Sequence, residues 1–193
     1  MTVTETPAGH KTFHEKLDLL KQRLLDMSQL AEELLATSVQ SFLRRDAGKA
    51  ESVLPADNEV DLLEVEIEQL AISLLALQQP MARDLRFIVS AIRIAGDLER
   101  VGDHAVNIAQ SALRMVDLRS GVAPPPEIAE MAQRSRKMLS DALDAVVRLD
   151  GTLGRDVCKR DDQVDALHES VFRILLTHMM EAPSTISAAL DLL

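Results

Sequence analysis

Pairs of carboxylates one helical turn apart are the residues of this sequence best suited to chemistry. Asp57 and Asp61 form one pair, and Glu99 and Asp103 form another. On an α-helix, side chains four positions apart lie on the same face with Cβ atoms about 5–6 Å apart, so two like charges repel each other. A bound cation would remove that repulsion, and carboxylate oxygens are ligands that hard cations prefer. Glu64 extends the first pair along the same face.

A third pair, Asp161 and Asp165, repeats the pattern of the first. The segments DNEVD (57–61) and DDQVD (161–165) share Asp-x-x-Val-Asp at a spacing of 104 residues, and each is followed by a proline, Pro80 or Pro183. Such a spacing predicts an internal duplication of one supersecondary unit. The predicted metal ligands are Asp57, Asp61, Glu64, Glu99, Asp103, Asp161 and Asp165.

The elements that would position these acids are helices, and the predicted fold class is all-α. Trp and Tyr are absent and Phe is rare, which disfavours pleated sheets, whereas helix-forming Leu, Ala, Glu and Arg are abundant. Apolar residues recur at gaps of three and four from Leu17 to Leu34, as in a helix packed along its whole length. The predicted helices are 13–45, a segment ending near 77, 82–118, 127–149 and 155–180.

Prolines mark two places where the predicted helices should begin, bend or end. Pro55 should start or kink the second helix, and RSGVAPPPE (119–127) cannot be helical because it holds three consecutive prolines. We therefore predict an N-terminal tail (1–12), a first three-helix unit (13–120) and a second three-helix unit (121–193). The second unit is expected to be incomplete, because the counterpart of Asp103 would fall beyond Leu193.

The helical rotation places the acids away from the apolar stripes. Glu99 and Asp103 lie on the face of their helix opposite Leu98 and Ala105, so they point outward or into a surface groove. The two pairs could then meet at a solvent-accessible seam between neighbouring antiparallel helices, with Gly96 or Gly102 allowing close approach. A competing interpretation is a solvated acidic face that binds nothing specific.

Composition and motifs exclude several function classes. The formal charge of −10 disfavours binding to nucleic acid. No phosphate-binding glycine loop, nucleophile elbow or zinc-type Cys/His spacing is present, so no enzyme is predicted. The single cysteine, Cys158, is expected to be a buried structural thiol. Without a signal peptide or an apolar span, we expect a cytoplasmic protein that reaches membranes only through partners.

The string LERVGDHAVNIA (98–109), together with ALQQPMARDLRFIVSAIRI (76–94) and the two Asp-x-x-Val-Asp segments, resembles the PhoU family of phosphate-transport accessory proteins. The resemblance implies two side-by-side three-helix bundles, a homodimer, and metal clusters on the bundle surface. It also implies a negative regulator of the phosphate-starvation response that contacts the phosphate importer's ATPase subunit and the cytoplasmic domain of a sensor histidine kinase.

Other functions stay open at this stage. A metal-buffering or metal-oxidising bundle is the second candidate, and a purely structural helical oligomer is the third. Iron, zinc, manganese and magnesium are all candidate ions, because the sequence cannot name the metal. His168 stands where the first unit has Glu64, which would alter the metal preference of the second site.

Overall fold

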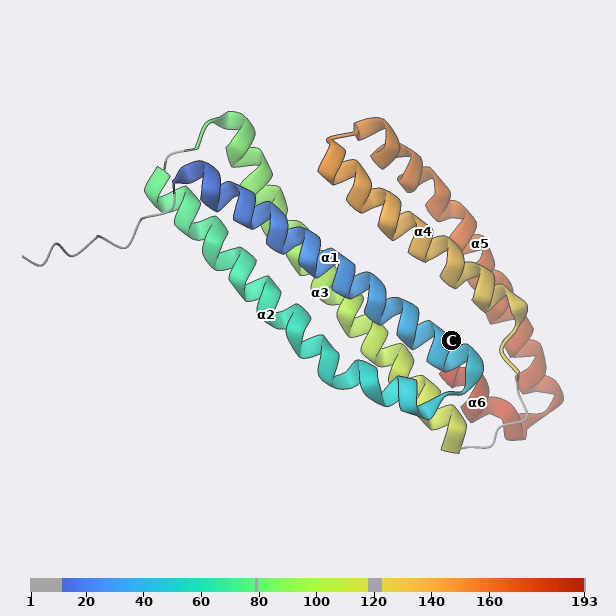
Figure 1. Ribbon diagram of the computed structural model, residues 1–193. Helices are drawn as coiled ribbons and strands as arrows, with labels where there is room; N and C mark the ends of the chain where they lie inside the picture. Colours follow the sequence, from blue (N-terminus) through green and yellow to red (C-terminus); the bar gives the residue numbers. More distant parts are fainter. Residues whose placement is uncertain (1–11, 79, 118–122, 193) are drawn as a thin grey trace, which may run out of the picture.

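The computed structural model describes residues 12–78, 80–117 and 123–192, which form long α-helices (Figure 1). We refer to α1–α3 as the first unit and to α4–α6 as the second unit. The helices are α1 (Phe13–Arg44), α2 (Ala47–Gln78), α3 (Ala82–Asp117), α4 (Pro126–Arg148), α5 (Gly151–Glu181) and α6 (Ile186–Asp191), with a 3-10 turn at Pro183–Thr185. The all-α prediction is confirmed.

The first unit is a three-helix bundle in which each helix contacts the other two. The apolar stripe predicted on α1 is its buried face: Leu17, Leu20, Leu24, Met27, Ala31 and Leu34. Val60, Ile67 and Leu74 of α2 and Leu98, Ala105 and Ala112 of α3 complete the core. The bundle therefore rests on the helical periodicity visible in the sequence.

The second unit is a helical hairpin that lies alongside the first unit, with α4 against α1 (Figure 1). Glu32 of α1 is partly buried at this contact, and the burial raises the pKa of its carboxyl although Arg136 of α4 partly offsets the effect. The short α6 contacts both α5 and α3. Arg114 Nε of α3 lies 2.7 Å from Asp191 Oδ1 of α6, so an ion pair joins the two units at that end.

The α1–α2 and α4–α5 connections are copies of one turn. Arg45 and Leu149 are the two non-glycine residues with positive φ in the described chain, at 53° and 55°, and they are 104 residues apart. The backbone amide that follows each of these residues donates a hydrogen bond to the carbonyl five positions earlier. The two bonds run from Asp46 N to Ser41 O (2.9 Å) and from Asp150 N to Ala145 O (2.8 Å). This turn extends the predicted repeat to α1 and α4 in the same register.

The same turn corrects one predicted boundary. The sequence predicts a turn at 150–154 and a helix from 155, but α5 begins at Gly151. Asp150 Oδ1 accepts hydrogen bonds from the amides of Thr152 (2.9 Å) and Leu153 (3.0 Å) and so caps the helix. Asp46 Oδ1 accepts from Lys49 N (3.1 Å) in the equivalent position. Because the Asp150 side chain accepts from the first amides of α5, the helix forms although it contains Gly151 and Gly154.

Two other expectations have separate outcomes. Pro55 lies inside α2 and does not start it, since α2 begins at Ala47. The tail predicted at 1–12, apart from Thr12, and positions 119–122 of the predicted proline break lie outside the described residues, as does Leu193. The break ends earlier than predicted, because α4 begins at Pro126 and a proline at the first helical position loses no intrahelical hydrogen bond. No helix in the described part has the length and apolar character needed to cross a bilayer.

Truncating the core of α2 should destabilise the protein far more than truncating its surface. Ile67 is fully buried and Leu62 is 65% exposed on the same helix. We expect Ile67→Ala to lower the free energy of unfolding by about 2–5 kcal/mol. Leu62→Ala should change it by no more than about 0.5 kcal/mol. Guanidinium unfolding followed by circular dichroism measures both, and equal losses would contradict this packing.

Candidate metal site on the first unit

The antiparallel packing of α2 and α3 brings the predicted acids of the first unit to one seam. Asp57, Asp61 and Glu64 come from α2, and Glu99 and Asp103 come from α3. Asp61 and Asp103 are exposed, whereas the other three are partly buried. We call these five residues the seam carboxylates. They lie at the surface of the bundle, as the rotation of the two helices predicts.

Gly102 leaves room for the side chain of Asp57 at the seam. A Cβ at this position would overlap Asp57 Oδ1 and would lie 3.5 Å from Val60 Cγ1. At Gly96 a Cβ would meet only Glu64 Oε1, at 3.5 Å, which is an ordinary van der Waals distance. Of the two glycines expected to allow close approach, Gly102 is therefore the one where an added Cβ would displace a neighbouring side chain.

Asp57 is the seam carboxylate with the least satisfied oxygen. Its Oδ1 is buried and has no hydrogen-bond partner among the described residues. A buried acceptor without a donor costs free energy unless a cation or a water meets it. The sequence treats Asp57 and Asp61 as equivalent members of a pair, so this asymmetry emerges only from the packing against Gly102.

The seam carboxylates interact electrostatically with one another. Burial raises the pKa of Asp57, and the charges of Asp61 and Asp103 raise it further. Burial also raises the pKa of Glu99, with added contributions from the other four seam carboxylates, the largest from Asp103. Each shift favours the protonated acid, so at neutral pH the seam stores repulsion across the helix pair.

No cation of the described chain offsets this repulsion. None of the ion pairs among the described residues involves a seam carboxylate. Arg100, which lies between Glu99 and Asp103 in the sequence, instead faces Asp97 with 3.9 Å between Nη1 and Oδ1. The seam is thus an uncompensated negative site.

The residue types at this seam fit a bound metal ion. Hard cations bind several carboxylate oxygens. Asp57 Oδ1 is an oxygen of this kind that has no hydrogen-bond partner and could ligate a metal ion. As the side chains stand, no three His, Cys, Asp or Glu residues of the described chain are gathered in a metal-binding arrangement. Repulsion keeps free carboxylates apart, so the oxygens would have to draw together around the ion.

The two remaining predicted ligands lie on the second unit. Asp161 and Asp165 lie exposed on α5, as does His168, and the described α6 ends at Asp191. The structure therefore does not pair these acids with a second helix as it pairs Asp57 with Asp103. Cys158 is exposed, so the expectation of a buried thiol is wrong.

Comparisons with known proteins agree with the duplicated helical fold. The family model described as "PhoU domain" matches residues 24–112 and again 128–193. A curated relative from Caulobacter vibrioides, named phosphate-specific transport system accessory protein PhoU homolog, is 38% identical over 183 residues. The match covers 95% of this chain and 80% of the relative. A relative of the same name from Aquifex aeolicus is 34% identical and is covered to 81%.

Solved structures give the same result. The crystal structure of PhoU from Pseudomonas aeruginosa is 32% identical, with a TM-score of 0.90 over 94% of this chain and 87% of that chain. The phosphate transport system regulatory protein PhoU from Streptococcus pneumoniae matches with a TM-score of 0.82 over 94% of this chain. At 24% identity, the second likeness concerns the fold alone. The duplicated bundle fold is thus confirmed.

The two seam glycines should respond differently to alanine. Gly96→Ala should stabilise the protein by about 0.5–1 kcal/mol, since alanine is the better helix former and the added Cβ has room. Gly102→Ala should stabilise the protein less than Gly96→Ala, or should destabilise it, because the added Cβ displaces the Asp57 side chain. Thermal unfolding of both variants without metal measures the difference. Equal stabilisation would show that Asp57 does not fill the space over Gly102.

The raised acid pKa values predict a pH dependence of opposite sign to that of salt-bridged acids. Because the folded pKa exceeds the ordinary value of 3.8 for Asp57 and 4.5 for Glu99, the native state binds more protons just above those values. In metal-free protein these groups therefore lower stability as pH rises through their raised pKa. Asp57→Asn should be more stable than wild type at neutral pH, and the gap should close on acidification. A gap independent of pH, measured by denaturant titration, would contradict the assignment.

Proposed function

The chain belongs to the PhoU family, and we propose that it acts as a regulatory adaptor of phosphate homeostasis and a negative regulator of the phosphate-starvation response. The proposal is supported by relatives at 34–38% identity that carry the name phosphate-specific transport system accessory protein. The family consists of regulatory accessory proteins and not of enzymes, in agreement with the absence of catalytic motifs from the sequence. A role in regulating phosphate transport follows from this membership.

The proposed partners are the ATPase subunit of the phosphate importer and the cytoplasmic domain of a sensor histidine kinase. A chain with a formal charge of −10 would approach basic patches on either partner fastest at low salt. We further propose that the protein is a cytoplasmic homodimer that reaches the membrane only by binding these partners. It would hold the kinase in its repressing state and restrain uptake when phosphate is plentiful.

The seam carboxylates would contribute to this function by holding metal. Asp57 and Asp61, with Glu64, would ligate from α2, and Glu99 and Asp103 would ligate from α3. A cation there supplies positive charge that cancels the repulsion, and the chain's own residues fix the spacing of α2 and α3. The single observation that supports this role most strongly is the buried, unpartnered Asp57 Oδ1 against Gly102. A fixed helix pair presents one surface to a partner, whereas a repelling pair samples several.

Metal binding at the seam should be visible as stabilisation. We expect the melting temperature of metal-stripped protein to rise when Mn²⁺ or Fe²⁺ is added, because a ligand that binds only the native state stabilises it. Asp61→Asn combined with Asp103→Asn should abolish the rise, whereas Asp161→Asn combined with Asp165→Asn is the matched control on α5. An unchanged melting temperature in wild type, or an equal loss in both double variants, would contradict a seam site.

The regulatory role is tested by pull-down with the purified importer ATPase and the purified kinase domain, each with metal and with chelator. Binding that weakens with chelator and with added salt is the expected result. Absence of binding to both partners would contradict the adaptor. The other candidate, a metal-oxidising bundle, rests on the same seam carboxylates, and it predicts catalytic consumption of Fe²⁺ by the purified protein, which the adaptor does not.

A further inference from the structure

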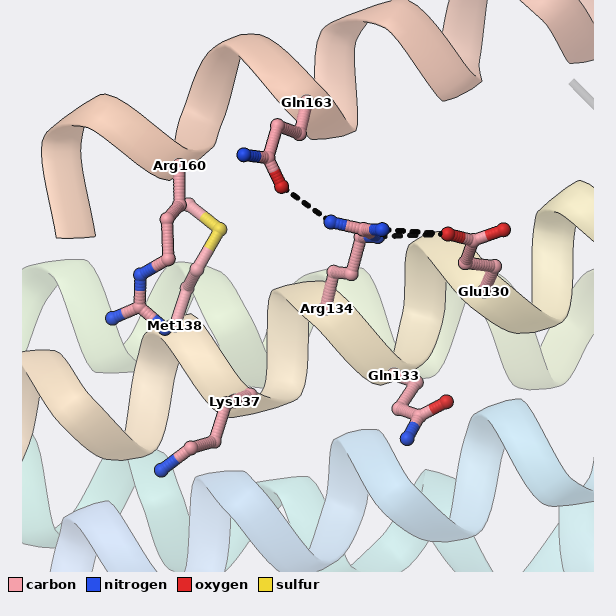
Figure 2. Close-up of a pocket in the computed structure, with 7 residues that line it drawn as sticks. All are labelled: Glu130, Gln133, Arg134, Lys137, Met138, Arg160 and Gln163. Atoms are coloured by element: carbon pink, nitrogen blue, oxygen red, sulfur yellow. Dashed lines mark hydrogen bonds and ion pairs between the residues drawn. The ribbon is translucent and has the colours of Figure 1, made fainter. Parts of the chain in front are cut away.

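A groove of about 590 Å3 lies between α4 and α5 on the second unit. Figure 2 shows Arg134 reaching from α4 toward Gln163 of α5, and Arg160 reaching from α5 toward Met138 of α4. The remaining lining residues are Glu130, Gln133 and Lys137. The lining thus holds three cations, two amides and one acid, and two further acids, Asp141 and Asp156, pair with Lys137 and Arg160 beside it.

The repeat shows that this positive lining is specific to the second unit. The register of 104 residues, fixed by the equivalent turns at Arg45 and Leu149, pairs Arg134 with Leu30 and Lys137 with Glu33. It likewise pairs Arg160 with Ala56 and Gln163 with Glu59. In each pair, the second unit has a basic or neutral residue where the first unit has a neutral or acidic one. A groove elsewhere between α1 and α2, not at the register-equivalent positions, has about 300 Å3, and its lining charges are one ion pair, Arg23 with Glu66 at 3.0 Å.

The acids around the groove position the cations without using all of their donors. Asp141 accepts a hydrogen bond from Lys137 (2.6 Å) and forms an ion pair with Arg160 Nη2 (2.8 Å), and these two contacts lower its pKa. Arg160 Nε is also 3.3 Å from Asp156. Nε and Nη2 of Arg160 are covered from solvent, and their contacts with Asp156 and Asp141 are ion pairs without the alignment of a hydrogen bond.

We propose that the α4–α5 groove binds a compact oxyanion that carries two or more negative charges, such as a pyrophosphate or a small polycarboxylate. Arg134 and Arg160 would contact it from the two helices, Lys137 would bind from the rim, and the amides of Gln133 and Gln163 would donate hydrogen bonds. The volume suits a small-molecule ligand. The lining holds no aromatic ring on which a nucleobase could stack, so a compact anion is favoured over a nucleotide. This site is independent of the proposed function and of the seam metal.

Isothermal titration of the full chain with pyrophosphate tests the proposal, in buffer with EDTA so that no metal bridges the anion to the seam. Orthophosphate, citrate and ATP are the comparison ligands. The groove variants are Arg134→Gln and Lys137→Gln. Arg173→Gln is the matched control, since Arg173 also lies on the second unit, pairs with a glutamate four residues away (3.1 Å) and is absent from the groove.

We expect saturable binding of pyrophosphate to wild type and to Arg173→Gln, with affinity reduced about tenfold or more in each groove variant, as for the loss of one charge-assisted hydrogen bond. Stronger binding of pyrophosphate than of citrate would identify a phosphoryl ligand, and the reverse a polycarboxylate. No saturable binding of pyrophosphate or citrate to wild type, or an equal loss in Arg173→Gln, would overturn the proposal. If Arg134→Gln unfolds, Lys137→Gln decides, because the Lys137 side chain is 68% exposed and its loss should leave the fold intact.

Discussion

The contact between Asp57 and Gly102 is the constraint that leaves a buried carboxylate oxygen without a partner at the α2–α3 seam. A side chain at position 102 would push Asp57 away, so the glycine lets α3 approach the carboxylate closely. The same approach buries Asp57 Oδ1 and leaves it without a donor, while four other carboxylates raise the local negative potential. Tight packing and like charge therefore act against each other at one seam. We propose that a bound cation relieves this conflict.

The long helices place that seam where a partner can reach it. The buried face of α1 contacts α2 and α3, and this packing turns the acidic faces of α2 and α3 outward. The second unit packs through α4 against α1, leaving the α2–α3 seam uncovered by α4 and α5 (Figure 1). Duplication gave both units the same capped turn, yet their charged grooves differ. One unit carries the acidic seam, and the other carries the basic groove between α4 and α5.

Periodicity was sufficient to predict the fold because each helix buries a stripe that the sequence already displays, as at Leu20, Ile67 and Leu98. It was also sufficient to place Asp61 and Asp103 at a shared seam. The start of α5 was mispredicted since glycines at 151 and 154 lower helix propensity, whereas the Asp150 cap acts through hydrogen bonds. The basic groove was not foreseen, because Arg134 and Lys137 each have an acid four residues away and look like ordinary surface pairs. Only the approach of α5 brings Arg160 beside them.

The account is tested most directly by locating the ion itself. Crystals of the protein soaked with Mn²⁺ and measured for anomalous scattering should show a peak between α2 and α3, with Asp57 and Asp103 oxygens at about 2.0–2.6 Å. Ligands from both helices are essential to the account, because relief of repulsion across the seam requires them. A peak that contacts carboxylates of one helix alone, or no peak at the seam, would contradict it.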